Sequence, residues 1–353
     1  MNFDEFKKQL MQDIPDQINS DAKIIVAENN VDKLQNESYQ GIVVRKEGEQ
    51  IGVTLNVSAL YEHMDRNDIS YDEMLSRATD IVEQGFEQSP EIDIASLSNY
   101  EAMKEKLIVQ VVPTAENADM LANIPHHEME DMSVVYRLNM GSSDNGRATV
   151  LVTNAMMDSY GITAEQLHQD ALEFAPMNEP AVIQSMAEVL MEMMGPEMGE
   201  MLPPEEMPMY VASVPDRVQG AGILAYPDFM EQAKERLGGD FYVLPSSVHE
   251  CILLADSGDM DRTQLEAMVK EVNETQVEPS ERLSDKVYHY DSEAKVFELA
   301  EKYDARRSAK EAALDENHEK GSVLKELGEK RKEVAEKMPK PKDLQARSAE
   351  VAL

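Results

Sequence analysis

The pattern of apolar and polar positions is sharpest in residues 241–256. An apolar run at 241–244 is followed by a Pro-Ser-Ser break, and a second apolar run then ends in Asp256. Pro245 has no backbone N–H and does not fit the middle of a hydrogen-bonded strand, while serine side chains bond to nearby backbone. An unbroken apolar run is typical of a strand covered on both faces. The segment therefore predicts two central strands that meet at a turn.

Apolar periodicity predicts helices and strands along the rest of the chain. Four apolar residues from Phe3 to Ile14 recur at helical spacing, and residues 107–112 form a short apolar run typical of a strand. Ser70 and Thr163 each precede Glu or Gln by three residues, which is the capping box that opens a helix. Further strands are predicted at 23–27, 39–45, 51–57, 132–138, 147–152, 210–214, 221–226 and, as an edge strand, 287–290. Further helices are predicted at 58–66, 100–106, 115–122, 154–160, 179–194 and 261–273, with helix again from residue 292.

Two passages share one order of elements. Residues 54–74 and 150–167 each contain a strand, a short helix and a helix with a capping box. A less similar stretch with the same order of elements begins at Cys251. An internal duplication explains this likeness, and so does convergence on common capping rules.

These elements predict an α+β protein with mixed or mostly antiparallel sheet, packed helices and two related subdomains. Pro, Gly, Met and Glu are dense in residues 196–215, which indicates a linker. It would join an N-terminal α+β region, 1–195, to a C-terminal α+β region, 216–300. Residues 301–353 are highly charged and predict a helical or disordered tail.

The charge balance limits the classes of partner. The 353 residues contain 33 Lys and Arg against 69 Asp and Glu, a formal net charge of −36. Residues 301–353 contain 13 basic and 12 acidic residues, which leaves 20 basic and 57 acidic residues, a net charge of −37, in residues 1–300. Nucleic-acid affinity depends largely on Lys and Arg that displace counterions, so we expect no direct nucleic-acid binding. An acidic surface suits solubility, docking of a basic partner, or mimicry of DNA.

Two further features bear on location. The sequence has no apolar span of about 18 residues, and its acidic, amphipathic start does not resemble a signal peptide. Cys251 is the single cysteine, which excludes an intramolecular disulfide framework and suits a reducing compartment. We therefore expect a cytoplasmic protein with no membrane association.

Ser246, Ser247, His249 and Cys251 are the weak candidates for catalysis. A histidine beside a serine or cysteine can activate it as a nucleophile, and alternate residues of a strand share one side. Catalysis also needs an orienting acid and an oxyanion hole, which the sequence does not show. A buried thiol beside a structural imidazole explains the same residues, and we assign no catalytic residue.

A methionine-rich segment is the candidate for partner binding. Methionine side chains adapt to different partner surfaces and their thioethers can bind Cu(I), although a helix core and a linker also explain the segment. The residues assigned to partner binding are Met194, Met198, Met201, Met207 and Met209.

Metal and nucleotide signals are weak. His126, His127, Glu128 and Glu130 are metal-ligand types, but adjacent histidines point apart and no His-Glu-x-x-His spacing occurs, so a surface loop is favoured. Residues 141–146 lack the lysine of a phosphate-binding loop and join two predicted strands. We predict no metal and no cofactor.

Three segments carry a resemblance to a known family: 241–250 (FYVLPSSVHE), 265–277 (LEAMVKEVNETQV) and 281–290 (ERLSDKVYHY). Together they resemble the DUF5688 family, uncharacterised proteins of anaerobic gut Firmicutes that are often found near mobile elements. The resemblance extends to about residue 300. It implies a bacterial cytoplasmic protein and brings no known activity, cofactor or site residue.

The expected function is that of a non-catalytic interaction or accessory factor with an unidentified protein partner. A hydrolase or transferase that uses the region of Ser246, Ser247, His249 and Cys251 is the alternative from another class. An acidic DNA mimic is the third. An enzyme should hold these side chains in a concave pocket with an orienting partner, whereas a non-catalytic protein buries them.

Overall fold

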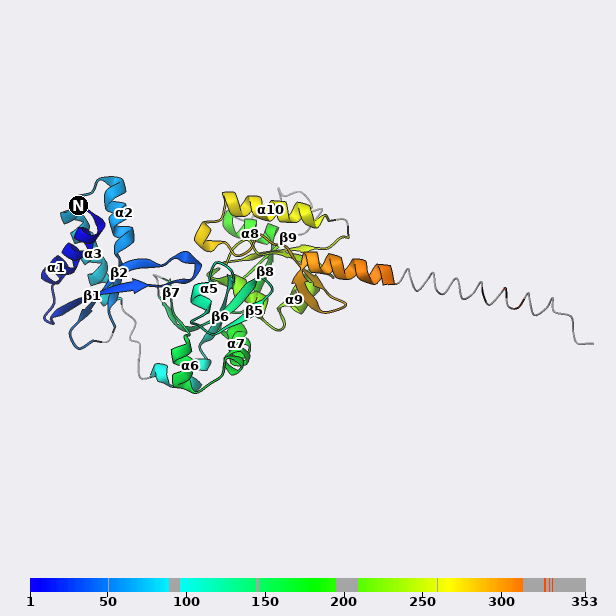
Figure 1. The fold of residues 1–353 in the computed structure, drawn as a ribbon, viewed down its shortest axis with the longest axis horizontal. Helices are drawn as coiled ribbons and strands as arrows, with labels where there is room; N and C mark the ends of the chain where they lie inside the picture. Colours follow the sequence, from blue (N-terminus) through cyan, green and yellow to red (C-terminus); the bar gives the residue numbers. More distant parts are fainter. Residues whose placement is uncertain are drawn as a thin grey trace, which may run out of the picture. The chain divides into compact units, whose positions relative to one another are not determined.

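The computed structural model describes residues 1–49, 51–88, 96–143, 146–194, 209–258 and 260–313, together with Leu327, Lys330 and Lys332. The chain separates into two compact units, Met1–Ala300 and Glu301–Leu353. The first unit combines helices with antiparallel sheets, which confirms the α+β prediction (Figure 1). In the second unit, residues 301–313 are helical. The division of residues 1–300 at a linker and the internal duplication stay predictions.

The first sheet and three helices share a core of their own. The strands are β1 (Ile24–Val31), β2 (Tyr39–Lys46) and β3 (Val53–Asn56), in the order β1-β2-β3. The helices are α1 (Phe3–Gln17), α2 (Val57–Asn67) and α3 (Tyr71–Glu87) (Figure 1). The predicted helical stripe of α1 is fully buried at Phe6, Leu10 and Ile14. The Ser70 hydroxyl accepts the Glu73 N–H and caps α3, as the sequence predicted.

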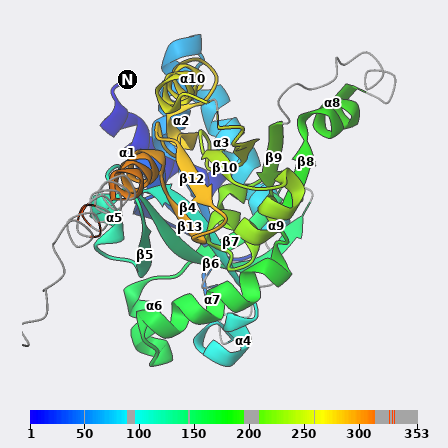
Figure 2. The same ribbon diagram turned by 90° about the vertical axis from the view of Figure 1, so that its right-hand side faces the viewer.

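The second sheet is built around its longest strand, β6 (Met132–Ser143). β4 (Leu107–Pro113) pairs with β6 along one edge, while β5 (His126–Met129) and then β7 (Gly146–Leu151) pair along the other. The helix α7 (Ala164–Asn178) packs on β4 and β5 (Figure 2). All seven residues of β4 are buried, as expected of a strand covered on both faces.

The third sheet has the order β13-β12-β10-β11-β9-β8. Its strands are β8 (Val182–Ser185), β9 (Met209–Ser213), β10 (Phe241–Leu244), β11 (Cys251–Ala255), β12 (Tyr288–Asp291) and β13 (Val296–Leu299). β10 and β11 lie at its centre, with Phe241 opposite Ala255. This confirms the prediction that residues 241–256 contain two central strands.

The other named helices connect these elements. They are η1 (Leu34–Asn36), η2 (Ser96–Ser98), α4 (Tyr100–Lys104), α5 (Ala118–Leu121), α6 (Asn154–Tyr160), α8 (Met186–Met194), η4 (Gly220–Ala225), α9 (Phe229–Leu237), α10 (Arg262–Thr275) and η5 (Pro279–Glu281).

Two predicted elements are wrong because tertiary pairing overrides local pattern. Residues 179–194 were predicted as one helix, yet β8 precedes α8, since Val182 and its neighbours pair with β9. Residues 221–226 were predicted as a strand and instead form the 3-10 helix η4. Gly222 allows this turn to approach the backbone of β4.

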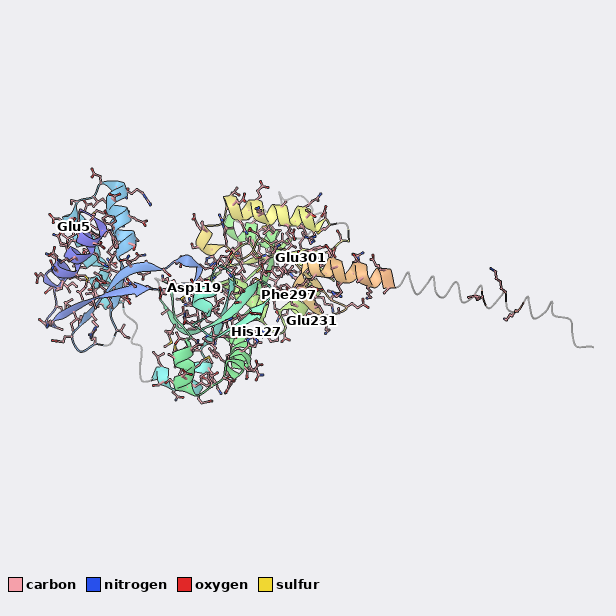
Figure 3. The ribbon with its side chains drawn as sticks, viewed as in Figure 1. Glu5, Asp119, His127, Glu231, Phe297 and Glu301 are labelled. Carbon is pink, nitrogen blue, oxygen red and sulfur yellow. The ribbon has the colours of Figure 1, made fainter. Side chains whose placement is uncertain are left out.

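The end of the third sheet also differs from prediction. β12 lies inside the sheet, because β13 pairs with its outer side where helix was expected from residue 292. Phe297 stacks on Tyr288 at 5.3 Å between ring centres, and the Tyr290 hydroxyl donates to Glu231 at 2.6 Å (Phe297 and Glu231 are labelled in Figure 3). Side-chain contacts across β12 therefore hold β13 in place.

One apolar core joins the second and third sheets. Val109 and Val111 of β4 lie in the same buried cluster as Val243 of β10, Leu253 of β11 and Ile223 of η4. Residues from Tyr100 to Leu299 contribute to this cluster, so strands before and after the methionine-rich segment share one interior.

A close backbone approach in this core gives a stability prediction. A β-carbon on Gly222 would lie 2.5 Å from the Val109 carbonyl oxygen. We expect Gly222→Ala to push η4 from β4 and lower the free energy of unfolding by about 1–3 kcal/mol, measured by urea denaturation. Gly239→Ala is the matched control, because a methyl group there meets no atom within 4 Å. Equal stability of the two variants would contradict the assignment.

Candidate functional site

The hairpin of β1 and β2 docks its tip onto the second sheet. Leu34 at the tip is 5% exposed and packs in a cluster with Val112 and Val135. The next residue, Gln35, has the left-handed φ of 63°. Its backbone N–H donates to Asn117 Oδ1 at 2.7 Å, and Asn117 Nδ2 donates to Gln35 Oε1 at 2.7 Å. Gln35 Nε2 also donates to the Arg282 carbonyl at 2.8 Å, so the tip is fixed on two sides.

Two cavities flank Gln35. The first, which we call the junction cavity, has a volume of about 460 Å³ and is lined by the tip, by β4 and β6, by the turn before β11 and by η5. The second has a volume of about 410 Å³ and is lined by Asp131, Arg282 and Ser284 among others. Both volumes fall in the range of small-molecule sites, roughly 300–1,000 Å³.

Arg137 enters the junction cavity from β6. Tyr136 and Leu138 point into the shared core, so the strand alternation places Arg137 on the opposite face, toward the tip. Its Nε donates to Gln110 Oε1 at 2.8 Å, and one Nη donates to Thr149 Oγ1 at 3.0 Å. Both acceptors are neutral. Burial, and then the nearby Arg147 charge, lower the pKa of Arg137 from its usual value.

His249 reaches the same cavity from the turn before β11. Its Nδ1 accepts the Gln219 backbone N–H at 3.2 Å, which leaves the ring proton on Nε2, 3.4 Å from Glu281 Oε1. The lone pair that a general base needs is therefore already used. The carboxylate of Glu281 orients the imidazole, and neither ring nitrogen is hydrogen-bonded to a serine hydroxyl of the described residues.

Arg147 secures the loop that carries Gln219. Arg147, on β7, forms an ion pair with Glu179, and both side chains are 7% exposed. Its Nε also lies 3.6 Å from Asp216, and its guanidinium donates to the Val218 carbonyl at 2.5 Å. These contacts hold residues 216–219 against β7, which positions the N–H that engages His249.

The remaining catalytic candidates are a buried thiol and two serines of the turn before β11. Cys251 is fully buried in the shared core, and burial raises the pKa of its thiol well above the usual range. The Ser247 hydroxyl accepts the His249 backbone N–H at 3.0 Å, and the Ser246 carbonyl accepts the N–H of Leu283 at 3.2 Å. The structure thus brings His249 to a cavity, and among the described residues no candidate nucleophile is hydrogen-bonded to its imidazole ring.

The methionine candidates are mostly outside the described residues. Met198, Met201 and Met207 lie there, and Met194 ends α8. Met209 opens β9 and packs, partly buried, against the cluster that contains Leu254.

His126 and His127 form β5 rather than the predicted surface loop, because β5 pairs with β6. His127 stacks on His168 of α7 with ring centres 4.1 Å apart (His127 is labelled in Figure 3). His168 Nδ1 and the buried Tyr136 hydroxyl are hydrogen-bonded at 2.8 Å. No group of three or more metal-ligating side chains occurs among the described residues.

The second cavity contains a polar cluster that the sequence analysis did not predict. The Asp131 carboxylate accepts hydrogen bonds from Ser284 Oγ at 3.0 Å and from the Tyr288 hydroxyl. Burial, and then the Asp131 charge, raise the pKa of Tyr288 far above its usual value. The cluster ties the turn before β6 to the segment before β12.

Arg137 and Gln110 are also site residues that sequence reasoning missed. The available signal was a polar residue inside an otherwise apolar strand: Gln110 interrupts residues 107–112, and Arg137 interrupts residues 132–138. Polar residues at such positions are hydrogen-bonded or line a cavity, and these two do both.

The fold and this site define an α+β protein with a polar cavity beneath a docked hairpin tip. A model of the family of unknown function DUF5688 matches residues 3–292, and the chain belongs to this family, as its resemblance implied. No curated protein and no solved structure matches the chain. Among the described residues, no helix has the length and apolar character needed to cross a membrane.

The burial of Cys251 gives a reactivity prediction. We expect no labelling of the folded chain by a thiol reagent across a pH series, because the side chain is buried and its raised pKa disfavours the thiolate. Labelling should become complete in concentrated guanidinium chloride. Fast labelling of the folded chain, slowed by His249→Gln, would instead show a thiolate paired with His249.

The stacked histidines give a pH prediction. Burial, and then the neighbouring His127, lower the pKa of His168 from its usual 6.5. A lowered pKa means that the unfolded chain binds the proton first, so stability falls as pH drops below about 6.5 and levels off below the folded pKa. Urea denaturation over this window should show a smaller loss for His168→Gln than for the native chain. His63→Gln, a change at a half-buried histidine of α2 far from this stack in sequence, is the control, and an identical pH dependence for all three chains would contradict the assignment.

Proposed function

We propose that this protein is a non-catalytic interaction or accessory factor that binds a basic protein partner in the bacterial cytoplasm. The observation that carries the proposal is the environment of two catalytic candidates, the Cys251 thiol and the His249 imidazole. Cys251 is buried with a raised pKa, and the His249 lone pair accepts a backbone N–H. A hydrolase or transferase would need one of these groups free to react.

The charge supports the choice of partner. Residues 1–300 have a net charge of −37, and a strongly acidic surface attracts basic partners over a distance set by ionic strength. The resemblance to DUF5688 implies a bacterial origin and a role connected to mobile elements, while the family model that matches residues 3–292 carries no known function. The methionines at 198, 201 and 207 are the proposed adaptable contacts of the partner surface.

The test is affinity capture from the native host with the tagged full chain as bait. We expect a specific basic protein that is released as salt rises, because exposed charges are screened. A charge-matched acidic protein and a variant with Met198, Met201 and Met207 replaced by Gln are the controls, and both should recover less. Repeated recovery of the same proteins by the acidic control would contradict the proposal.

Two outcomes would favour the other functions. Displacement of the captured partner by duplex DNA would indicate a DNA mimic. Covalent labelling of Ser246 or Ser247 in the folded chain by a serine-directed probe, lost in His249→Gln, would indicate an enzyme and overturn the proposal.

A further inference from the structure

We propose that the junction cavity is a binding site for a small zwitterion with one carboxylate and one ammonium group, as in an α-amino acid, and that Arg137 binds the carboxylate. This site lies beyond the proposed protein interaction and does not depend on it.

Arg137 is a cation without an acidic partner among the described residues. No described carboxylate oxygen lies within 4.0 Å of its guanidinium nitrogens, in a chain whose formal net charge is −36. Gln110 and Thr149 occupy Nε and one Nη, and they fix the plane of the guanidinium from two neighbouring strands. In the part of the chain that the structure describes, the second Nη donates to no protein atom, so its two N–H groups and the other N–H of the first Nη remain for a ligand. A carboxylate is the group that a fixed guanidinium binds best, because its two oxygens accept parallel hydrogen bonds.

The position of Arg137 in the sheet leaves room for that ligand. Along β6, β5 ends opposite Val135 and β7 ends opposite Arg137, so Arg137 lies where one partner strand replaces the other. Gln110 beside it is 4% exposed and belongs to the rigid strand β4. The binding group is therefore held by strands rather than by loops, as a precise site requires.

The other charges in the cavity select a zwitterion over an anion. Besides Arg137, the walls include Lys33 and His249 and the acids Asp32, Glu37 and Glu281. Glu281 lies against His249, and the Lys33 ammonium lies 5.2 Å from the centre of the Tyr39 ring. Asp32 and Glu37 belong to the hairpin tip and are exposed. They repel phosphate and dicarboxylates but attract an ammonium group.

The test is calorimetric titration of the full chain, with thermal shift as a second measurement. The probes are the amino acids glycine, glutamine and leucine. Acetate has only the carboxylate and methylammonium only the ammonium group, while glutarate and inorganic phosphate are anions without an ammonium group. We expect saturable binding of at least one amino acid, and weaker binding of each comparison compound. Bound ligand should raise the melting temperature, since it binds only the folded state.

Variants locate the site. Arg137→Gln should weaken amino-acid binding by roughly 10- to 100-fold, the effect of losing a charged hydrogen-bonded pair. Arg66→Gln, an exposed arginine on α2, should leave it unchanged. If Arg137→Gln does not fold, the surface variant Asp32→Asn with Glu37→Gln takes its place and should weaken amino-acid binding several-fold while leaving acetate binding unchanged.

Three results would overturn the proposal. They are the absence of saturable binding by any amino acid tested, amino-acid binding that survives the substitutions at Arg137 and at the tip, and tighter binding of phosphate or glutarate than of every amino acid.

Discussion

The burial of the second sheet on both faces is the constraint on which the rest of the structure depends. One face of β4 and β6 packs Val109, Val111 and Tyr136 into the core shared with the third sheet. The other face packs Val112 and Val135 against Leu34 of the hairpin tip. A sheet covered on both faces forces every polar residue it carries to find a partner inside the protein. Gln110 and Arg137 are two of these residues, and Arg137 Nε donates a hydrogen bond to the Gln110 side chain.

The fold was predictable where the signal is local. The apolar spacing of Phe6, Leu10 and Ile14 predicted α1, and the Pro245 break predicted the corner between β10 and β11. The errors occurred where distant residues decide the structure. Val182 joins β8 because β9 offers a pairing edge, and η4 turns at Gly222 because the Val109 carbonyl lies against it. Neither partner is visible within a short window of sequence.

The candidate site was predictable only in part. His249 was named from its neighbours in sequence, but its partners Gln219 and Glu281 lie about 30 residues away on either side. The tip residue Gln35 contacts Asn117 and the Arg282 carbonyl across still longer separations. A cavity formed by such contacts has no sequence motif, and only the polar residues inside apolar strands indicate it.

If Arg137 served only to stabilise the fold, its charge would add an unfavourable desolvation term to the free energy of folding. Arg137 is partly buried, and burying part of a guanidinium carries a desolvation penalty that neutral acceptors such as Gln110 and Thr149 offset less than a carboxylate would. An apolar side chain of similar volume would fill the same face of β6 and extend the cluster of Val112 and Val135 toward Leu34. Proteins generally hold more strain and unpaired charge at sites that bind or react than in cores that only pack. A partly buried cation that is held by two neutral acceptors beneath the hairpin tip therefore points to recognition rather than to packing.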